Sequence, residues 1–408
     1  MNLLLSSNQH NIHQHITITG SKSESNRALL LQALYPTISI ENLSNSDDSQ
    51  VMQKGLQVHN GTVDIHHAGT AMRFLTAFFA TQEGRDVVLT GSQRMTERPI
   101  KILVDALGQL GADITYEKNE GYPPLKIKGK KITKHQVSLA ANVSSQYISA
   151  LLLVAPTLEN GLELTLEGKI TSVPYIKMTL ALLEEIGVST SFNGNVISVN
   201  PLAKISEKTL VVESDWSSAS YFYSIASLVE VGSEISIASY KATSLQGDSV
   251  LQEIYKQFGV ETSFNKNVVK LKKVKEIPQE TVINIDLANA PDIAQTIAVS
   301  CFGLGLKCEL SGLHTLKIKE TDRLEALKTE LTKLGANISV TNKELFLEPS
   351  EIIKEKIAID TYNDHRMAMA FAPLALRVPI VINDAEVVSK SYPDFWKDME
   401  SLKIKVQG

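Results

Sequence analysis

The chain has 408 residues, of which 43% are hydrophobic and 21% charged, and its formal net charge is −5. This length suffices for two domains with complete cores, and the mildly acidic balance argues against a general nucleic-acid-binding protein. The first residues, MNLLLSSNQHNIHQH, do not form a signal peptide, and no apolar run approaches the ~18 residues of a membrane span, so we expect a cytoplasmic protein. Cys301 and Cys308 lie in or beside an apolar run, which predicts buried thiols rather than a disulfide framework or a metal site.

The first predicted helix lies in GSKSESNRALLLQAL, which runs from Gly20 to Leu34. Ser25 is suited to be its N-cap, and the leucines and alanines that follow have the periodicity of a buried helix. Lys22 and Arg27 then lie near a helix N-terminus, where the macrodipole disfavours cations. Their position makes sense if backbone N–H groups, hydroxyls and cations together bind an anion there.

This helix is the first of six apolar helical segments, and five of them begin about 73 residues apart. Their predicted starts are Ser25, Thr70, Ser144, Ser217, Pro291 and Asp364. Each is followed by a strand-like run, in chain order ISIENL, DVVLTG, LELTLEG, EISIAS, CELSGL and IVINDA. A second amphipathic helix follows, and in four units a glycine suited to the C′ position ends it: Gly111, Gly187, Gly259 and Gly335.

Six units of about 70 residues predict an α/β fold of two domains with three units each. The border should fall around residues 211–215, at a short hinge, because no flexible linker marks it. The strand HITITG precedes the first unit, and the pattern leaves open which half it joins.

Cations recur at or near the helix starts and in the loops between units. Seven are candidate anion ligands: Lys22, Arg27, Arg94, Lys319, Arg323, Arg366 and Lys390. Serines and aspartates there can be plain N-caps, and KETDR can be an exposed helix face. The recurrence instead predicts a cleft between two domains that binds small polyanions. Asp292 and Glu320 stand among the cations as acid–base candidates, and neighbouring cations would keep Asp292 ionised. No phosphate-binding P-loop or dinucleotide motif occurs, so nucleotides are not expected ligands.

The motifs, taken together and in order, resemble those of the 5-enolpyruvylshikimate-3-phosphate synthase family. The resemblance covers almost the whole chain and rests on GSKSESNRALLLQAL, AGTAMR, GSQRMTERPI, VSSQY, SVPYI, IKETDRLEAL, NDHRMAMAF and KSYPDF. It implies two similar domains, each of three βαβαββ units around buried helices, the inside-out α/β barrel of enolpyruvyl transferases. It also assigns the leading strand to the last three units, giving domains 1–20 with 214–408, and 21–213.

The resemblance implies transfer of the enolpyruvyl group of phosphoenolpyruvate to the 5-hydroxyl of shikimate 3-phosphate, on the route to chorismate and the aromatic amino acids. Asp292 would accept the hydroxyl proton, Glu320 would protonate the methylene carbon, and Lys22 would reach both substrates. The implied shikimate 3-phosphate contacts are Lys22, Ser23, Arg27, Ser144, Ser145, Gln146, Ser172, Asp292, Thr315 and Lys319. The implied phosphoenolpyruvate contacts are Lys22, Gly69, Arg94, Gln146, Arg323, Arg366 and Lys390. Tyr175 and Asp364 are supporting residues of the site as a whole.

The resemblance implies no metal and no organic cofactor, only the two small-molecule substrates, no nucleic-acid or membrane partner, and a monomer. Four residues depart from the family pattern: His67, Phe74, Val173 and Thr315. Phe74 replaces a proline and is expected to act on the phosphoenolpyruvate site through the Gly69–Thr70 backbone, whereas Thr315 replaces an asparagine and puts one phosphate contact in doubt. Two alternatives remain: an enolpyruvyl transferase acting on UDP-N-acetylglucosamine, and a non-catalytic anion-binding paralogue.

Overall fold

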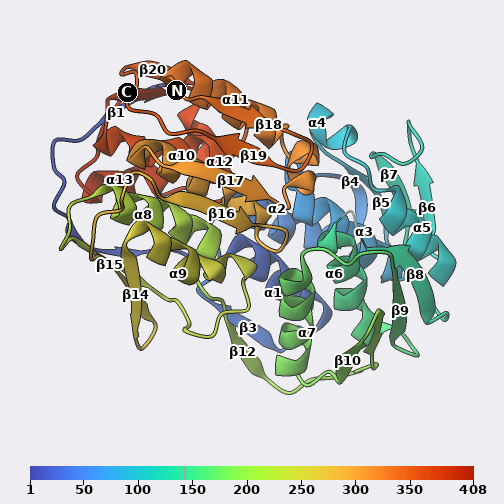
Figure 1. Ribbon diagram of the computed structural model, residues 1–408. Coiled ribbons are helices and arrows are strands. Elements are labelled where there is room, and N and C mark those ends of the chain that lie inside the picture. The colour runs from blue at the N-terminus through green and yellow to red at the C-terminus, as the bar shows by residue number, and fades with distance from the viewer. Residues whose placement is uncertain (142–143) are drawn as a thin grey trace. The chain divides into compact units, whose positions relative to one another are not determined.

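A computed structural model describes residues 1–141 and 144–408. By internal contacts the chain divides into two compact units. Unit 1 consists of Met1–Thr19 and Glu213–Gly408, and unit 2 is Gly20–Val212. In Figure 1, unit 2 runs from blue to green and unit 1 from yellow-green to red, with the dark blue N-terminal strand added to it.

Unit 2 is a mixture of helices and short strands. Its helices are α1 (Lys22–Leu34), α2 (Asp47–Leu56), α3 (Gly69–Thr81), α4 (Gln93–Thr96), α5 (Lys101–Leu110), α6 (Ser145–Val154), η1 (Ala155–Thr157) and α7 (Val173–Glu185). Its strands are β3 (Ile38–Glu41), β4 (Asn60–Asp64), β5 (Asp86–Thr90), β6 (Asp113–Tyr116), β7 (Leu125–Lys128), β8 (Gln136–Ala140), β9 (Leu162–Glu167), β10 (Thr190–Asn193), β11 (Val196–Val199) and β12 (Lys208–Val211).

Unit 1 is built in the same way, with more 3-10 turns (η). Its helices and turns are α8 (Trp216–Leu228), η2 (Gly247–Val250), α9 (Leu251–Ile254), η3 (Tyr255–Phe258), η4 (Pro291–Ile293), α10 (Ala294–Leu304), η5 (His314–Ile318), α11 (Arg323–Leu334), α12 (His365–Phe371), η6 (Ala372–Leu376), η7 (Ala385–Lys390) and α13 (Phe395–Ser401). Its strands are β1 (Leu3–Ser6), β2 (His13–Thr17), β13 (Glu234–Ala238), β14 (Val260–Asn265), β15 (Val268–Lys273), β16 (Val282–Asp286), β17 (Lys307–Ser311), β18 (Ile338–Val340), β19 (Leu345–Leu347), β20 (Ile357–Ile359), β21 (Ile380–Ile382) and β22 (Lys405–Gln407).

The four-stranded sheets repeat one plan, in which a parallel pair of strands is extended by two antiparallel strands. In unit 2 the sheets are β4-β5-β7-β6, β10-β11-β9-β8 and the pair β12-β3, and in unit 1 they are β20-β21-β1-β22, β14-β15-β13-β2 and β16-β17-β19-β18. Strand β2 carries the first half of HITITG and pairs in parallel with β13, so this strand belongs to unit 1. The terminal strands β1 and β22 are antiparallel neighbours, and both chain ends lie close together in Figure 1.

Each unit encloses helices whose residues are mostly buried, as the apolar sequences of α3, α6, α10 and α12 predict; α1 is buried along most of its length although it carries several polar residues. In unit 2 these are α1, α3 and α6, which contact one another, and in unit 1 α10 contacts both α8 and α12. Strands such as β9, LELTLE, alternate buried and exposed residues, so one face of each such sheet covers the core. Cys301 and Cys308 are fully buried in the core of unit 1, as predicted.

Five of the six predicted helix starts are confirmed to within one residue, where the start at Pro291 is that of the 3-10 turn η4 leading into α10. Ser144, Asp215 and Asp364 are the N-caps of α6, α8 and α12, and each side chain accepts a hydrogen bond from a backbone N–H in the first turn. The prediction for the first helix is wrong, since α1 begins at Lys22. Ser25 lies inside that helix, where its hydroxyl accepts a hydrogen bond from the N–H of Ser44 at 2.9 Å.

The predicted C′ glycines are also confirmed. Gly111, Gly259 and Gly335 adopt left-handed backbone angles directly after α5, η3 and α11, with φ of 99°, 74° and 106°. The second helix of the fourth unit is broken, because the stretch 247–258 forms η2, α9 and η3 rather than one helix.

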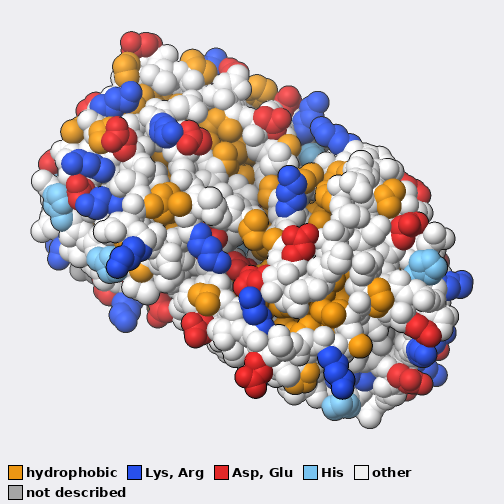
Figure 2. Space-filling view, turned by 90° about the horizontal axis from the view of Figure 1, so that it is seen from below, with side chains coloured by type: hydrophobic (Ala, Val, Ile, Leu, Met, Phe, Trp, Pro, Cys, Tyr) orange, Lys and Arg blue, Asp and Glu red, His pale blue; other side chains and the backbone are white. Residues whose placement is uncertain are grey.

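In the described ranges, no helix is long and apolar enough to cross a membrane. Basic and acidic side chains are interspersed on the face drawn in Figure 2.

Candidate active site

The predicted site residues fall into two sets, one on each unit, and each set is described by itself. Unit 1 carries Asp292, Thr315, Lys319, Glu320, Arg323, Arg366 and Lys390, with Asp364 in support. Unit 2 carries Lys22, Ser23, Arg27, Gly69, Arg94, Ser144, Ser145, Gln146 and Ser172, with Tyr175 in support.

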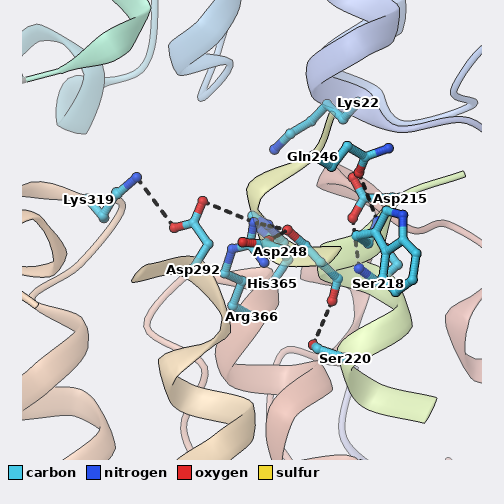
Figure 3. A network of polar contacts seen from close by, with 12 residues as sticks. Lys22, Asp215, Ser218, Ser220, Gln246, Asp248, Asp292, Lys319, His365 and Arg366 are labelled. Carbon is cyan, nitrogen blue, oxygen red and sulfur yellow. Dashed lines mark hydrogen bonds and ion pairs between the residues drawn. The ribbon is translucent and has the colours of Figure 1, made fainter. Parts of the chain in front are cut away.

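Asp292, in the turn η4 ahead of the buried helix α10, is contacted by three cations. Its Oδ1 lies 2.8 Å from Nη1 of Arg323 and 3.4 Å from Nζ of Lys319. Its Oδ2 accepts a hydrogen bond from Nη2 of Arg366 at 3.3 Å. Figure 3 shows the carboxylate facing both Lys319 and Arg366. Burial alone would raise the pKa of Asp292, but the charges of Arg366, Lys319 and Arg323 outweigh it and hold that pKa far below its ordinary value.

Arg323, the first residue of α11, is only 2% exposed and bridges three carboxylates. Its Nε donates to Asp364 at 2.6 Å, its Nη2 to Glu320 at 2.7 Å and its Nη1 to Asp292 at 2.8 Å. Burial lowers the pKa of Arg323, but these three carboxylates reverse the direction and raise it above its ordinary value. Both acid–base candidates therefore share one guanidinium.

Arg366 lies in the first turn of α12, whose N-cap Asp364 accepts a hydrogen bond from the backbone N–H of Arg366 at 2.9 Å. Its Nη2 also donates to the Ser217 hydroxyl at 3.2 Å. The segment before α12 is strained, because Tyr362 and Asn363 have left-handed φ angles of 53° and 55°. Lys390 donates a hydrogen bond to the Asn363 carbonyl.

Thr315 lies in η5, four residues before Lys319. Its hydroxyl is buried, and no hydrogen-bond partner for it lies in residues 1–141 or 144–408. Burying a hydroxyl without a hydrogen-bond partner costs free energy, and a bound ligand could form the missing hydrogen bond.

In unit 2, Lys22 lies at the start of α1 and its Nζ is 3.3 Å from a carboxylate oxygen of Asp48. Arg27, one turn later, is buried and donates to Thr179, to Ser149 and to the Ser23 carbonyl at 2.8, 3.0 and 2.7 Å. A further contact runs from its Nη2 to the Tyr175 carbonyl. Burial lowers the pKa of Arg27 to about 10, so the guanidinium remains charged at neutral pH.

Phe74 lies fully buried on α3, with its ring centroid 5.4 Å from the guanidinium carbon of Arg27. This is the geometry of a cation–π contact. The departure from the family pattern at Phe74 therefore touches the Arg27 network directly, in addition to any effect on the backbone at Gly69.

The guanidinium of Arg98 lies against Gly69 at the start of α3. A Cβ atom added to Gly69 would lie 2.7 Å from Nη1 of Arg98, so only glycine leaves this guanidinium its place. Nε of Arg98 is buried, and no hydrogen-bond partner for it appears among the described residues. Arg94 is exposed and forms a 3.5 Å ion pair with Glu97. Arg73 fixes this corner by donating to the carbonyls of Gly69 and Pro99 at 3.1 and 3.2 Å.

The start of α6 carries Ser144 as N-cap, followed by Ser145 and Gln146, whose Nε2 donates to the Thr70 hydroxyl at 3.2 Å. Ser172 precedes α7 with a left-handed φ of 53°, an uncommon conformation for serine and one often found at functional sites. His67 is exposed and its Nδ1 lies 2.8 Å from the Ser92 hydroxyl.

Several residues of these clusters were not assigned a role from the sequence. Asp48 pairs with Lys22, Arg98 lies against Gly69, and Asp248 accepts a hydrogen bond from the Ser217 hydroxyl. A signal exists for Arg98, the second arginine of QRMTERP. Asp48 and Asp248 stand in ordinary turn-like stretches, SNSDDSQ and LQGDSV, and only the fold brings them to the site residues.

Comparison with known proteins places the chain in a family. The model of EPSP synthase (3-phosphoshikimate 1-carboxyvinyltransferase) matches residues 56–399. A 3-phosphoshikimate 1-carboxyvinyltransferase of Bacteroides fragilis is 45% identical, over 94% of each chain, and one of Shewanella baltica is 36% identical, over 96% of this chain and 97% of the relative. In fold, the chain is similar to EPSP synthase from Acinetobacter baumannii, with a TM-score of 0.79 over the whole of both chains at 21% identity. The chain therefore belongs to the EPSP synthase family.

Proposed function

We propose that this protein transfers the enolpyruvyl group of phosphoenolpyruvate to the 5-hydroxyl of shikimate 3-phosphate and releases phosphate. Family membership supports the reaction. The observation that carries the chemistry is the Asp292 carboxylate, which is held ionised by Lys319, Arg323 and Arg366. A carboxylate among cations can both accept a proton and stand beside bound anions.

The cations are proposed to bind the substrate anions. Phosphoenolpyruvate is assigned to Lys22, Gly69, Arg94, Gln146, Arg323, Arg366 and Lys390. Arg98 is proposed as a further residue of this site, because its guanidinium lies against Gly69. Shikimate 3-phosphate is assigned to Lys22, Ser23, Arg27, Ser144, Ser145, Gln146, Ser172, Asp292, Thr315 and Lys319.

The shared guanidinium suggests how substrate binding activates Asp292. Asp364 is fully buried and keeps its bond to Arg323, whereas Asp292 and Glu320 are 16% and 20% exposed. An arriving phosphate or carboxylate competes for Arg323 with these two accessible partners. Since a carboxylate that loses a cation gains proton affinity, substrate binding raises the pKa of Asp292 from its strongly lowered value toward a useful range.

The reaction then proceeds by addition and elimination. Glu320 delivers a proton to the methylene carbon of phosphoenolpyruvate, C2 gains cationic character, and the 5-hydroxyl adds to it while Asp292 accepts the hydroxyl proton. This gives a tetrahedral ketal phosphate. Loss of phosphate, with a methyl proton returning to a base, restores the double bond as an enol ether. The cations stabilise the charge that develops on the departing phosphate.

The test is release of inorganic phosphate from phosphoenolpyruvate with each of two acceptors. We expect release with shikimate 3-phosphate and none with UDP-N-acetylglucosamine. Release with the UDP-sugar alone would identify the other enolpyruvyl transferase, and no release with either would support a non-catalytic anion-binding protein. The loop GSQRMTE in the second of the six repeats lacks the cysteine that is usual in the UDP-sugar enzyme, and this disfavours that alternative.

We further propose that the enzyme acts as a monomer in the cytoplasm, without a nucleic-acid partner. All the residues assigned to the substrates come from one chain, so the reaction as proposed needs no second copy. Light scattering coupled to gel filtration should give a mass near 44.7 kDa. A stable dimer under assay conditions would contradict the proposal.

A further inference from the structure

Asp248 is a buried carboxylate that the proposed mechanism does not use. It is 2% exposed and lies in η2, in a loop attached to the start of α8. Its Oδ2 accepts a hydrogen bond from the Ser217 hydroxyl. For Oδ1, no hydrogen-bond partner lies in the part of the chain that the structure describes.

Asp248 is not needed to hold this loop against the start of α8, because Gln246 already does so. The side-chain oxygen of Gln246 accepts from the backbone N–H of Trp216 and its Nε2 donates to the Ser214 carbonyl, both at 2.9 Å. Asp248 adds only one bond to a hydroxyl, and burying a carboxylate with an unpartnered oxygen costs free energy. A structural role alone would be better served by a neutral side chain.

The bond from Ser217 to Asp248 decides what Ser217 offers to Arg366. A hydroxyl has one hydrogen, and here Asp248 accepts it, so the Ser217 oxygen presents lone pairs to Nη2 of Arg366 at 3.2 Å. The same Nη2 donates to Asp292 at 3.3 Å. Two acceptors on one nitrogen fix the rotation of the guanidinium, and Figure 3 shows Asp248, Arg366 and Asp292 together.

We propose that Asp248 is a positioning residue that, through the Ser217 hydroxyl, orients the Arg366 guanidinium for the anion of phosphoenolpyruvate. The role rests on the proposed function, since it takes Arg366 as a phosphoenolpyruvate ligand. Asp248 itself touches neither substrate; it acts on the direction of one hydroxyl.

Asp248 also adds a titratable charge to this network. Burial, with a smaller contribution from the charges of Asp292 and Asp215, raises its pKa to about 7, against the opposing effects of Arg366 and the Ser217 bond. Above this pKa the extra negative charge opposes an anion at Arg366, and below it the hydrogen bond remains without that charge. The affinity for phosphoenolpyruvate should therefore fall as the pH rises through neutrality.

The experiment measures kcat and both KM values between pH 6 and 8.5 for the full-length protein and four single variants. At pH 6, where Asp248 is mostly uncharged, Asp248→Ala and Ser217→Ala should each raise KM for phosphoenolpyruvate about tenfold, the effect of one lost hydrogen bond to a charged group. KM for shikimate 3-phosphate should change little. The double variant should resemble either single one, because both remove the same relay.

Asp248→Asn separates charge from orientation, because its amide oxygen can still accept from Ser217. At pH 6 its KM for phosphoenolpyruvate should match wild type, and the ratio of wild-type to variant KM should increase with pH. This ratio cancels the titration of phosphoenolpyruvate itself. Asp398→Asn is the matched control, since Asp398 also accepts from a buried hydroxyl, Tyr392 at 2.6 Å, and also has a pKa raised by burial. Its ratio should not depend on pH.

Two results would overturn the inference while leaving the proposed function intact. One is a wild-type KM for phosphoenolpyruvate in both alanine variants. The other is a fall in kcat together with similar rises in both KM values and a lower unfolding temperature. This result would mean that Asp248 has a structural role. If wild type releases no phosphate with shikimate 3-phosphate, the proposed function fails first, and this role of Asp248 fails with it.

Discussion

Asp292 illustrates how strongly neighbouring charges can change the pKa of a carboxylate, and with it the strength of that carboxylate as a base. With Lys319, Arg323 and Arg366 around it, the group stays ionised at any ordinary pH and is a weak base. Its usefulness as a base therefore depends on the substrate anions that draw these cations away.

Asp292→Asn removes the proton acceptor while nearly preserving volume. We expect both substrates to remain bound, since the cations are kept, and turnover to fall by ~10²-fold or more. Calorimetry measures the binding and phosphate release measures kcat. Near-normal turnover would show that another group takes the hydroxyl proton.

Asp248 should leave a signature in stability as well as in kinetics. Its pKa rises on folding from an ordinary 3.8 to about 7, so the folded state binds the proton more tightly, and wild type loses stability as the pH rises from about 4 to 7. Asp248→Asn removes this dependence. The variant's stability relative to wild type should increase over that window and level off above it, by at most about 4 kcal/mol.

Urea unfolding at pH 4.5 and pH 8 measures this difference. Any fixed cost of the buried amide cancels, because only the change with pH is compared. A constant difference at both pH values would mean that Asp248 is not shifted by folding.

Part of the site could be predicted residue by residue, and part could not. Arginine or lysine at a buried helix start conflicts with the helix dipole, and this conflict singles out Lys22 and Arg366 from sequence alone. Asp248 has no such signal, since an aspartate in a turn-like stretch is ordinary. Its link to Arg366 spans 118 positions in the sequence and arises only from packing. Arg94 and Arg98 share one motif, and only the contact with Gly69 separates them.

At the scale of elements, the helices were predictable where one cap residue stood before an apolar run, as at Asp364. The first helix was misplaced because serines occur at 21, 23 and 25, and the one suited to be a cap is instead needed by the N–H of Ser44. The same tertiary requirement could not be seen at Phe74. From the sequence, a phenylalanine on the apolar helix α3 is expected to be a core residue only, whereas the Phe74 ring also contacts the guanidinium of Arg27.

The helix α3 offers a matched pair of phenylalanines to test that support. Phe74→Leu removes the ring beside Arg27 and should raise KM for shikimate 3-phosphate about two- to fivefold, in line with a cation–π contact. Phe78→Leu is the control, because Phe78 is equally buried and its ring lies 4.8 Å from Arg85 rather than Arg27. Both should lose about 1–2 kcal/mol of stability. Equal KM values in the two variants would remove Phe74 from the substrate site.

For the molecule as a whole, the repeat could be seen in the sequence because each of the six segments of about 70 residues has the same order of apolar and polar runs. The pattern could not assign the leading strand, since HITITG has no partner in sequence; its partner β13 lies more than 200 residues later. The predicted domains, 1–20 with 214–408 and 21–213, differ by a single residue at each border from the two contact units. We propose that these units are the folding domains.

The tryptophans allow a test of whether one ligand contacts both units. Both of them, Trp216 and Trp396, belong to unit 1, so their fluorescence follows the unfolding of unit 1 alone, whereas far-UV circular dichroism follows both units. Shikimate 3-phosphate is assigned to residues of each unit. A hundredfold excess over Kd should therefore stabilise both, by about 2.7 kcal/mol, and both signals should move to higher temperature. Lys319→Met, which removes a contact assigned to unit 1, should reduce the fluorescence shift more than the circular dichroism shift. If the ligand moved only the circular dichroism transition, then Asp292, Thr315 and Lys319 would not be its ligands.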